Sequence, residues 1–480
     1  MPSRVAVVGA GITGLTAAYR LVRSLGEDAE VFVFESNQGA GGKVRTVEVG
    51  GVRVEAGADS FVVRKPWAVD LCNELGLEDR LVVPGATGAF VWTQGRLQPF
   101  PPRSAFGIPS RVGDLLRWKG LPLPARLRAA LDLYRPARRG EADESLGRLL
   151  RRRLGRRAAA VMVEPLLAGL HAGDPDRLGT HATFPELADW ERRHGSLIRG
   201  ARAAVKAGPP AGPMFATVWG GLDGLIDALV SRLGPERLRL ATPVLGIRRE
   251  GGRYRLQTDS AEFDADAVVM AAPAFGSSRL LSALNPDAAR GLASIPYAST
   301  AVVILVYPEG TADRLPEGTG FVTPIGQGAV TACTWISRKW PADELGSRAV
   351  LRCFIGRAGS EQALELPDDR LVDQVRAESE AAAPMPGAPE AARVIRWPQA
   401  MPQYEVGHLD RVEGIDRALL GTPGIFVSGS AYRGVGIADC VRQAGEVAGR
   451  VTEFLRAEGR TGKPAEDDQT DEREAIGWTM

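Results

Sequence analysis

Cysteine and histidine are both scarce in this chain of 480 residues, with four of each. The cysteines lie far apart and form no Cys-x-x-Cys pair, so the sequence supports neither a disulfide framework nor a zinc site. Four histidines are too few to favour a histidine-based metal centre, and we predict no metal. We therefore expect reduced thiols and a cytoplasmic protein.

Long apolar runs are absent as well. No stretch of 18 or more apolar residues occurs, which argues against a transmembrane helix. The apolar segment 5–19 lacks a strongly charged leader and a convincing cleavage site, and it contains three regularly spaced glycines. We therefore interpret it as part of the fold rather than as a targeting signal.

A strong net charge is missing too. Basic and acidic residues number 59 and 58, which argues against a dedicated nucleic-acid binder. Only 6 of the basic residues are lysines. The balance hides an asymmetry, because residues 103–157 contain 15 basic and 5 acidic side chains.

The remaining composition, 44% apolar and 24% charged, is that of an ordinary globular protein, and the length suits two or three domains. A strand at 4–8, a helix at 14–25 and a strand at 30–35 predict a βαβ unit with a parallel sheet. Further along, we expect helices at 224–233 and 437–456 and strands at 244–249, 253–258, 267–272, 299–307, 349–355 and 425–428.

The first glycine-rich turn has the spacing of a dinucleotide-binding motif. Its residues are Gly9, Ala10, Gly11, Ile12, Thr13 and Gly14, between the first strand and the first helix. The first glycine permits the tight turn, the second lets the backbone approach a pyrophosphate, and the third packs the helix against the strand. Glu35, with Ser36 beside it, ends the next strand about 20 residues later, where a carboxylate can accept ribose hydroxyl hydrogen bonds.

Two later segments resemble the extended fingerprint of FAD-containing oxidases. One is the glycine cluster 39–46 with Gly42 and Lys43, and the other is the stretch 55–61 with Gly57, Ala58, Asp59 and Ser60. Near the end, residues 424–440 resemble the closing strand, turn and helix of such enzymes, with Val435, Gly436 and Ile437 facing the flavin. A helix dipole there would stabilise negative charge on a reduced flavin. Ser430 stands where many relatives carry Asn or Asp, which departs from the pattern.

Four further stretches narrow the resemblance. Residues 166–178 (LLAGLHAGDPDRL), 182–187 (ATFPEL), 218–229 (VWGGLDGLIDAL) and 396–408 (RWPQAMPQYEVGH) resemble protoporphyrinogen and coproporphyrinogen III oxidases, within the flavin amine oxidase superfamily. The segments occur in the family's order up to about residue 456. The more general motifs also fit amine oxidases and carotenoid desaturases.

The resemblance implies a mixed α/β fold in three parts. We expect a discontinuous Rossmann-like FAD-binding domain at 1–65, 215–275 and 395–456, and a β-sheet substrate-binding domain at 66–100 and 276–394. A helical domain at 101–214 and a disordered acidic tail at 457–480 complete the prediction. The Arg-rich helices have three interpretations: a solvated face, a peripheral membrane-docking surface, or a rim that attracts a carboxylated substrate.

The resemblance also implies individual roles. Val244 and Trp397 fall where relatives touch FAD, and residues 59–65 fall at the mouth of the substrate cavity. Asp59, Arg64 and Lys65 are therefore substrate-binding candidates. His171 joins them as a cavity-wall candidate, at a position where relatives often have Tyr. No Ser-His-Asp, Cys-His or paired-carboxylate constellation is evident, so we assign no catalytic side chain.

The implied reaction is an O2-dependent six-electron oxidation of a porphyrinogen in haem biosynthesis. A meso carbon gives hydride to the flavin, a pyrrole N–H gives up a proton, and oxygen reoxidises the flavin with release of H2O2. We favour coproporphyrinogen III, with protoporphyrinogen IX as the alternative. The last residues, REAIGWTM, faintly resemble the start of coproheme decarboxylases, which suggests downstream haem-pathway enzymes as partners. An amine oxidase, a carotenoid desaturase and a non-catalytic flavin or porphyrin carrier stay open as other hypotheses.

Overall fold

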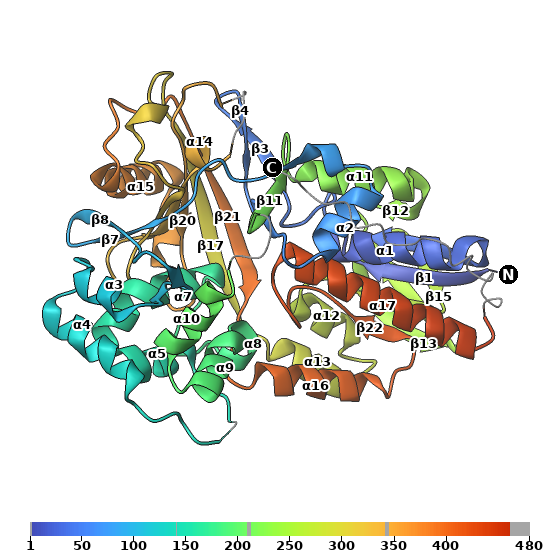
Figure 1. Cartoon of the computed structure of the whole chain (residues 1–480). Helices are drawn as coiled ribbons and strands as arrows, with labels where there is room; N and C mark the ends of the chain where they lie inside the picture. Colours follow the sequence, from blue (N-terminus) through green and yellow to red (C-terminus); the bar gives the residue numbers. More distant parts are fainter. Residues whose placement is uncertain (1, 141, 209–212, 341–344, 461–480) are drawn as a thin grey trace.

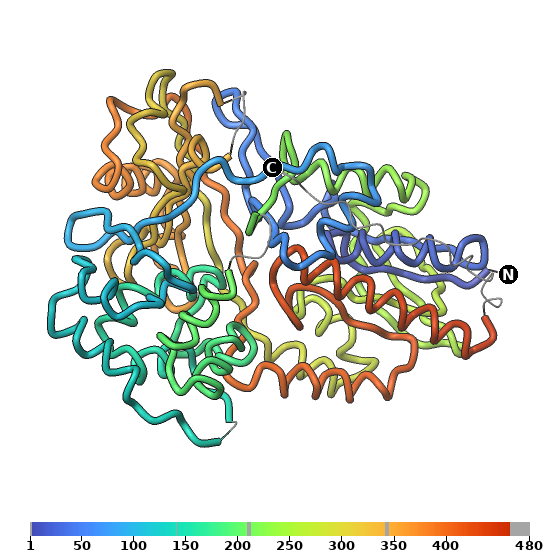
Figure 2. The backbone as a smooth tube through the Cα atoms, in the orientation of Figure 1, coloured from blue at the N-terminus to red at the C-terminus, as the bar shows by residue number. Residues whose placement is uncertain are grey.

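A computed structural model describes residues 2–140, 142–208, 213–340 and 345–460, and the statements below concern these residues. A parallel sheet with its helices, a mostly antiparallel sheet and a helical region form three neighbouring parts (Figure 1). The chain passes between the parts several times, and its C-terminal helix runs beside its N-terminal strand and helix (Figure 2).

The parallel sheet contains five strands in the order β12-β2-β1-β16-β22. Their bounds are β1 Ser3–Val8, β2 Ala29–Phe34, β12 Leu238–Arg239, β16 Ala267–Met270 and β22 Ile425–Val427. Alternate residues of β1 enter different cores, because successive side chains of a strand point to opposite faces. Val5 and Val7 pack with the helices on one face, whereas Ala6 and Val8 pack with the elements on the other.

Each face of this sheet is covered by elements from distant parts of the sequence. One face packs against α1 Ile12–Leu25, α2 Trp67–Glu74, α11 Asp223–Leu233 and α17 Ile437–Ala457. The other packs against the antiparallel strands β13 Val244–Glu250, β14 Arg253–Thr258 and β15 Glu262–Ala265, and against α12 Ala274–Leu281, α13 Pro286–Ala293 and α16 His408–Leu419. The parallel sheet of the predicted βαβ unit is therefore present, with helices on one face and an antiparallel sheet and helices on the other.

The second large sheet has seven strands in the order β21-β17-β20-β19-β18-β7-β8. Their bounds are β7 Phe90–Thr93, β8 Arg96–Pro99, β17 Tyr297–Val306, β18 Gly320–Val322, β19 Val330–Trp335, β20 Val350–Ile355 and β21 Ala391–Pro402. One face packs against α15 Asp368–Ala382. The other packs against the hairpin β3 Thr46–Val49 and β4 Val52–Glu55, beside α14 Ile336–Lys339. The hairpin also contacts the start of α11, because Arg53 of β4 pairs with Asp223 at 2.7 Å.

The helical region surrounds a core of its own. Its helices are α3 Val112–Arg117, α4 Leu123–Ala130, α5 Leu146–Leu154, α6 Arg156–Ala158, α7 Glu164–Leu170, α8 Thr180–Thr183, α9 Pro185–His194 and α10 Leu197–Lys206. A π-helical turn, Ala159–Val163, connects α6 to α7. Inside the region, the fully buried Arg153 guanidinium is paired with Asp132 at 2.6 Å. Burial of such a cation requires this partner.

The smaller sheets link these parts. In one, β11 Phe215–Val218 pairs with β5 Phe61–Val62 and with β6 Leu81–Val82. In another, β9 Ser104–Ala105 pairs with β10 Ile108–Pro109. No helix in the described part of the chain combines the length and the apolar character needed to cross a bilayer.

The expected elements of the βαβ unit and the later strands and helices form, with boundaries shifted by a few residues. The mixed α/β fold class is confirmed. Several boundaries of the predicted division do not coincide with the packing. Helices α2, α12 and α13, predicted to belong to the substrate part, share cores with the parallel sheet. Strand β21, predicted to belong to the FAD part, pairs with β17 in the seven-stranded sheet. Of the predicted acidic tail, residues 461–480 lie outside the described residues.

Candidate active site

The three glycines of the first turn differ in their backbone angles and in the space around their Cα atoms. Gly9 has φ +110°, which favours glycine. A Cβ on Gly14 would lie 1.9 Å from the carbonyl oxygen of Gly9, so the helix can approach the strand only at a glycine. Gly11 has an ordinary φ of −74°, and a Cβ there would meet nothing within 4 Å. The space over Gly11 is therefore open to a ligand.

Glu35, which directly follows β2, accepts hydrogen bonds from this turn and from the residues after the strand. Its Oε2 accepts a hydrogen bond from the Ala10 amide at 2.9 Å, and its Oε1 accepts from the Asn37 amide at 2.9 Å and from the Ser36 hydroxyl at 3.2 Å. Each carboxylate oxygen can accept more than one hydrogen bond. Oε2 therefore keeps a lone pair for a ribose hydroxyl. The carbonyl of Glu35 accepts from Thr242, two residues before Val244 opens β13.

The second glycine cluster lies directly against the first. The Gly41 amide donates to the carbonyl of Ala10 at 2.8 Å, and a Cβ on Gly42 would lie 3.4 Å from the Cα of Gly11. The next residue, Lys43, reaches across the molecule and donates to the carbonyl of Ala400 at 2.6 Å. Burial lowers the pKa of Lys43. Its Nζ lies 3.4 Å from the Ser430 hydroxyl, which places a cation beside the C-terminal turn.

The segment 57–60 lies between this cluster and the seven-stranded sheet. A Cβ on Gly57 would lie 1.9 Å from the carbonyl oxygen of Lys43, so only glycine fits this crossing. The indole N–H of Trp397 on β21 donates to the carbonyl of Ala56 at 2.8 Å. The Ala58 amide donates to the carbonyl of Lys43 at 3.2 Å. Lys43, Gly57, Ala58 and Trp397, which the sequence predicts to contact the cofactor, therefore lie close together.

Asp59 is held by two cations, Lys339 at the end of α14 and Arg352 on β20 of the seven-stranded sheet. Its Oδ2 lies 2.6 Å from Lys339 Nζ and 3.5 Å from Arg352 Nη1, and its Oδ1 accepts from the Ser60 hydroxyl at 2.8 Å. Burial acts to raise the pKa of Asp59, but Lys339 and Arg352 outweigh it and lower the pKa to about 2. Arg352 also donates to the carbonyl of Gly57. The carboxylate is therefore occupied by partners inside the chain.

Glu55 has the opposite electrostatic environment, four residues earlier in the chain. Burial raises the pKa of Glu55 to about 7, although its carboxylate accepts hydrogen bonds from the Leu222 amide at 2.7 Å and from Thr46 at 3.2 Å. Nearby Arg352 favours its charged form. Two carboxyl groups close in sequence, Glu55 and Asp59, are thus held with very different proton affinities.

The C-terminal turn brings a second helix N-terminus to the same place. Val435 and Gly436 precede Ile437, the first residue of α17, and no side chain caps this helix or α1. Ile12 and Ile437, the first residues of α1 and α17, lie in the same hydrophobic core. The N-termini of α1 and α17 therefore converge, each with unpaired backbone amides and the positive end of a helix dipole. This arrangement suits a ligand that carries phosphate groups and a second anionic centre.

Tyr404 and His408 form hydrogen bonds with the backbone of the C-terminal turn. The Tyr404 hydroxyl donates to the carbonyl of Ser430 at 2.8 Å and accepts from the Gly434 amide at 2.8 Å. The His408 ring stacks on Tyr404 with centroids 3.9 Å apart, and its Nε2 lies 2.9 Å from the carbonyl oxygen of Tyr432. Burial lowers the pKa of His408 to about 4, so the ring is neutral at pH 7 and its Nε2–H donates.

The other substrate-binding candidates occupy different environments. Lys65 is paired with Asp439 of α17 at 2.7 Å. His171 is buried between Phe184 and Tyr404, with ring centroids 5.6 and 5.9 Å away. Burial lowers the pKa of His171 to about 4, so its ring is uncharged at pH 7. Arg64 is exposed, and no partner for its guanidinium exists in the described residues.

Sequence reasoning missed Lys339, Arg352, Tyr404 and His408. One compositional signal was available, because lysine is rare in this Arg-rich chain. Three of the 6 lysines, Lys43, Lys65 and Lys339, lie at this site. In the described residues, no group of three or more His, Cys, Asp or Glu side chains could hold a metal ion.

Comparison with known proteins extends these observations. A family model described as flavin containing amine oxidoreductase matches residues 12–452. The coproporphyrinogen III oxidase of Bacillus subtilis (strain 168) is 35% identical over 92% of this chain and 96% of its own. The chloroplastic protoporphyrinogen oxidase of Nicotiana tabacum is 31% identical over 94% of this chain and 85% of its own. The crystal structure of a candidate protoporphyrinogen oxidase from Exiguobacterium sp. 255-15 matches with a TM-score of 0.85 and 34% identity, covering 95% of this chain and 99% of that one.

Proposed function

Because the chain belongs to the flavin-containing amine oxidoreductase family, we propose that it is an FAD-dependent oxidase that converts coproporphyrinogen III to coproporphyrin III in haem biosynthesis. The observation that carries this proposal is the likeness to the Bacillus subtilis enzyme over nearly the whole of both chains. The reaction removes six electrons and six protons from the substrate. Three molecules of O2 would accept them and leave as three molecules of H2O2.

The proposed cofactor FAD fits the residues at the site. Gly9, Gly11 and Gly14 with Glu35 would hold the adenosine and pyrophosphate half, because the space over Gly11 is open and the α1 amides are uncapped. The segment 57–60, with Trp397 behind it, and the turn 435–437 would hold the flavin half. Bound FAD supplies a hydride acceptor that oxygen can reoxidise.

The chain's own contribution to this reaction is mainly positional and electrostatic. The N-terminus of α17 places a positive dipole end where a reduced flavin would carry negative charge. Lys43 places a positive charge near Ser430, and Ser430 belongs to the turn that leads into α17. The Asp59, Lys339 and Arg352 cluster fixes the segment 57–60 against the seven-stranded sheet. We therefore assign Asp59 to positioning of the cofactor segment.

Substrate carboxylates require cations that are free to bind them. Lys65 is already paired with Asp439, whereas Arg64 has no partner in the described residues. We therefore propose that Arg64 pairs with a propionate of the substrate at the cavity mouth. His171 would contribute an uncharged ring to the cavity wall, since burial keeps it deprotonated at pH 7.

Protoporphyrinogen IX is the second candidate substrate, because a plant protoporphyrinogen oxidase is also similar over most of the chain. Coproporphyrinogen III carries four propionates, whereas protoporphyrinogen IX carries two propionates and two vinyl groups. The two porphyrinogens should be supplied side by side to the purified protein under air, with porphyrin fluorescence as the readout. Faster turnover of coproporphyrinogen III is expected, and faster turnover of protoporphyrinogen IX would assign the protein to the alternative.

A second experiment separates the oxidase from other functions of the same fold. The purified protein should show flavin absorbance, and anaerobic addition of coproporphyrinogen III should bleach it. A bound flavin that stays oxidised would favour a carrier. Release of H2O2 with an amine, without porphyrinogen turnover, would establish an amine oxidase. Turnover of a carotenoid alone would establish a desaturase.

We further propose that the protein is cytoplasmic and attaches peripherally to membranes. The supporting observation is a leucine stripe on α4 and the turn after it. Leu123, Leu127 and Leu131 are each more than half exposed, and Tyr134 is 82% exposed. These residues recur at helical spacing and are interspersed with arginines, as in helices that lie in a membrane interface.

A further inference from the structure

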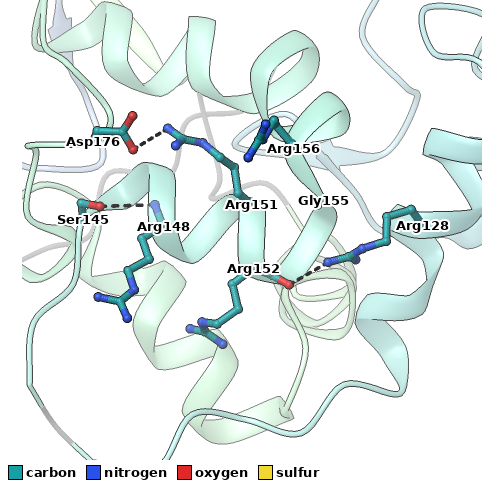
Figure 3. A pocket seen from close by; sticks show the side chains of 8 residues that line it. All are labelled: Arg128, Ser145, Arg148, Arg151, Arg152, Gly155, Arg156 and Asp176. Atoms are coloured by element: carbon teal, nitrogen blue, oxygen red, sulfur yellow. Dashed lines mark hydrogen bonds and ion pairs between the residues drawn. The ribbon is translucent and has the colours of Figure 1, made fainter.

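An arginine-lined pocket lies in the helical region, formed by α4, α5 and the residues around them (Figure 3). Its volume is about 640 Å³. The lining residues are Arg128, Ser145, Arg148, Arg151, Arg152, Gly155, Arg156 and Asp176. None of them belongs to the glycine turns, the segment 57–60 or the turn 435–437. The pocket is therefore separate from the proposed flavin site.

Two of the five arginines are neutralised within the chain and are held in place. Arg151 pairs with Glu164 at 2.9 Å and with Asp176 at 2.6 Å. Arg152 pairs with Glu144 at 2.5 Å and with Glu191 at 2.6 Å. Ser145 caps the start of α5, where its hydroxyl accepts from the Arg148 amide. These contacts fix the positions of Arg151, Arg152 and the start of α5 at the pocket.

The other three arginines have no carboxylate partner in the described part of the chain. Arg128 donates only to the carbonyls of Arg152 and Arg153, at 3.0 and 3.1 Å. Among the described residues, the guanidinium groups of Arg148 and Arg156 have no hydrogen-bond or ion-pair partner, and both side chains are exposed. Arg148 and Arg152 extend from α5 in the same direction, whereas Arg151 extends toward Asp176 (Figure 3).

Like charges held close together destabilise one another unless a counter-charge is present. Burial, Arg135 and Arg153 lower the pKa of Arg128 and outweigh the opposite effect of Asp132, which agrees with an excess of positive charge around it. An anion in the pocket would relieve this excess. Guanidinium groups match phosphate and carboxylate oxygens with two parallel hydrogen bonds, so several arginines around one cavity suit a ligand with several such groups.

We propose that this pocket binds a small polyanion that carries two or more phosphate or carboxylate groups. The pocket is open to solvent, and its volume of about 640 Å³ lies in the range of small-molecule sites. Arg128, Arg148 and Arg156 supply the free charge, and Arg151 and Arg152 are fixed at the pocket. The proposal concerns a site outside the proposed active site and does not depend on oxidase activity.

Tripolyphosphate is the first probe, and citrate is the second. Isothermal titration of the flavin-loaded protein with tripolyphosphate should show saturable binding. The double variant Arg148→Ser/Arg156→Ser should weaken this binding by at least about tenfold, the loss expected when charge-assisted contacts are removed. Citrate should compete with tripolyphosphate, since both chemistries would use the same arginines.

The matched control is Arg157→Ser, which removes an exposed arginine that neighbours Arg156 but does not line the pocket. It should leave the Kd unchanged, and all variants should keep the flavin content and Tm of the parent protein. Equal Kd values in the parent and the double variant would overturn the proposal. Equal weakening by Arg157→Ser would also overturn it, because binding would then follow total charge rather than the pocket.

Discussion

The hydroxyl of Tyr404 donates a hydrogen bond of 2.8 Å to the carbonyl oxygen of Ser430. The phenol oxygen of Tyr404 also accepts a hydrogen bond from the Gly434 amide, so one phenol closes the turn that leads into α17. The backbone of Tyr404 is also fixed, because its carbonyl accepts from the Gly179 amide at 2.8 Å. The side chain therefore links the helical region to the turn that we propose contacts the flavin.

Replacement of Tyr404 by Phe should lower kcat while FAD stays bound. The variant leaves the Ser430 carbonyl and the Gly434 amide without their buried partner, at a cost of about 1–3 kcal/mol. Steady-state kinetics and flavin absorbance measure the two effects. Tyr134→Phe is the matched control, since Tyr134 is 82% exposed. An unchanged kcat in Tyr404→Phe would show that the turn keeps its geometry without the phenol.

Replacement of Gly11 by Leu should abolish FAD retention without unfolding the chain. The backbone at Gly11 accepts any residue, and the new side chain would enter the space that we assign to the pyrophosphate. Flavin absorbance after purification and far-UV circular dichroism are the measurements. Gly449→Leu on α17 is the control, since a side chain there also meets nothing within 4 Å. Full flavin occupancy in Gly11→Leu would mean that the site is misplaced.

Replacement of Asp59 by Asn should destabilise the protein by about 3 kcal/mol at pH 7. Removal of one partner leaves Lys339 and Arg352 largely buried without their counter-charge. The pKa of Asp59 in the folded chain is about 2, below its ordinary value of 3.8, so its stabilising effect is complete above about pH 4 and is lost as the pH falls toward 2.

Urea unfolding at pH 7 and at lower pH measures this difference for Asp59→Asn. The matched control is Asp287→Asn, whose side chain is 73% exposed. The two variants should differ at pH 7 and converge in acid. If Asp59→Asn loses no more stability than Asp287→Asn, Asp59 does not position the cofactor segment.

Replacement of Arg64 by Met should raise the KM for coproporphyrinogen III by about tenfold and leave kcat unchanged. A cation that binds a propionate equally in the ground state and the transition state affects only KM. Initial rates over a range of substrate concentrations provide the test, and Arg157→Met is the control. A KM equal to that of the parent would exclude Arg64 from substrate binding.

Replacement of Leu127 and Leu131 by Ser should weaken binding to phosphatidylglycerol vesicles by about tenfold. Insertion of each leucine into the interface contributes on the order of 1 kcal/mol, and the nearby arginines make the binding sensitive to salt. Co-sedimentation with vesicles measures the effect, and Leu420→Ser is the control, with Leu420 79% exposed outside the stripe. Absence of binding by the parent protein would overturn the membrane proposal.

Much of the fold and part of the candidate site were predictable from the sequence. The βαβ unit is local, and its signals are apolar periodicity and glycine spacing, which act over a few residues. The partners of Asp59 were not predictable, because Lys339 and Arg352 are about 280 residues away or more along the chain. Tyr404 was part of a recognised stretch, but its bonds to Ser430 and Gly434 depend on how two loops meet.

By itself, the sequence determined the family, the glycine-rich turns beside the first helix and the Arg-rich character of the helical region. These properties follow from residue order within short segments, since a turn at Gly9 or an uncapped helix start at Gly11 needs only local backbone geometry. Only the tertiary structure decided which charges are neutralised and which are free. Within the described residues, Lys65 is paired and Arg64 is not, and Arg152 is paired whereas Arg148 is not. The physical reason is that an ion pair depends on distance in space, which packing of remote segments sets.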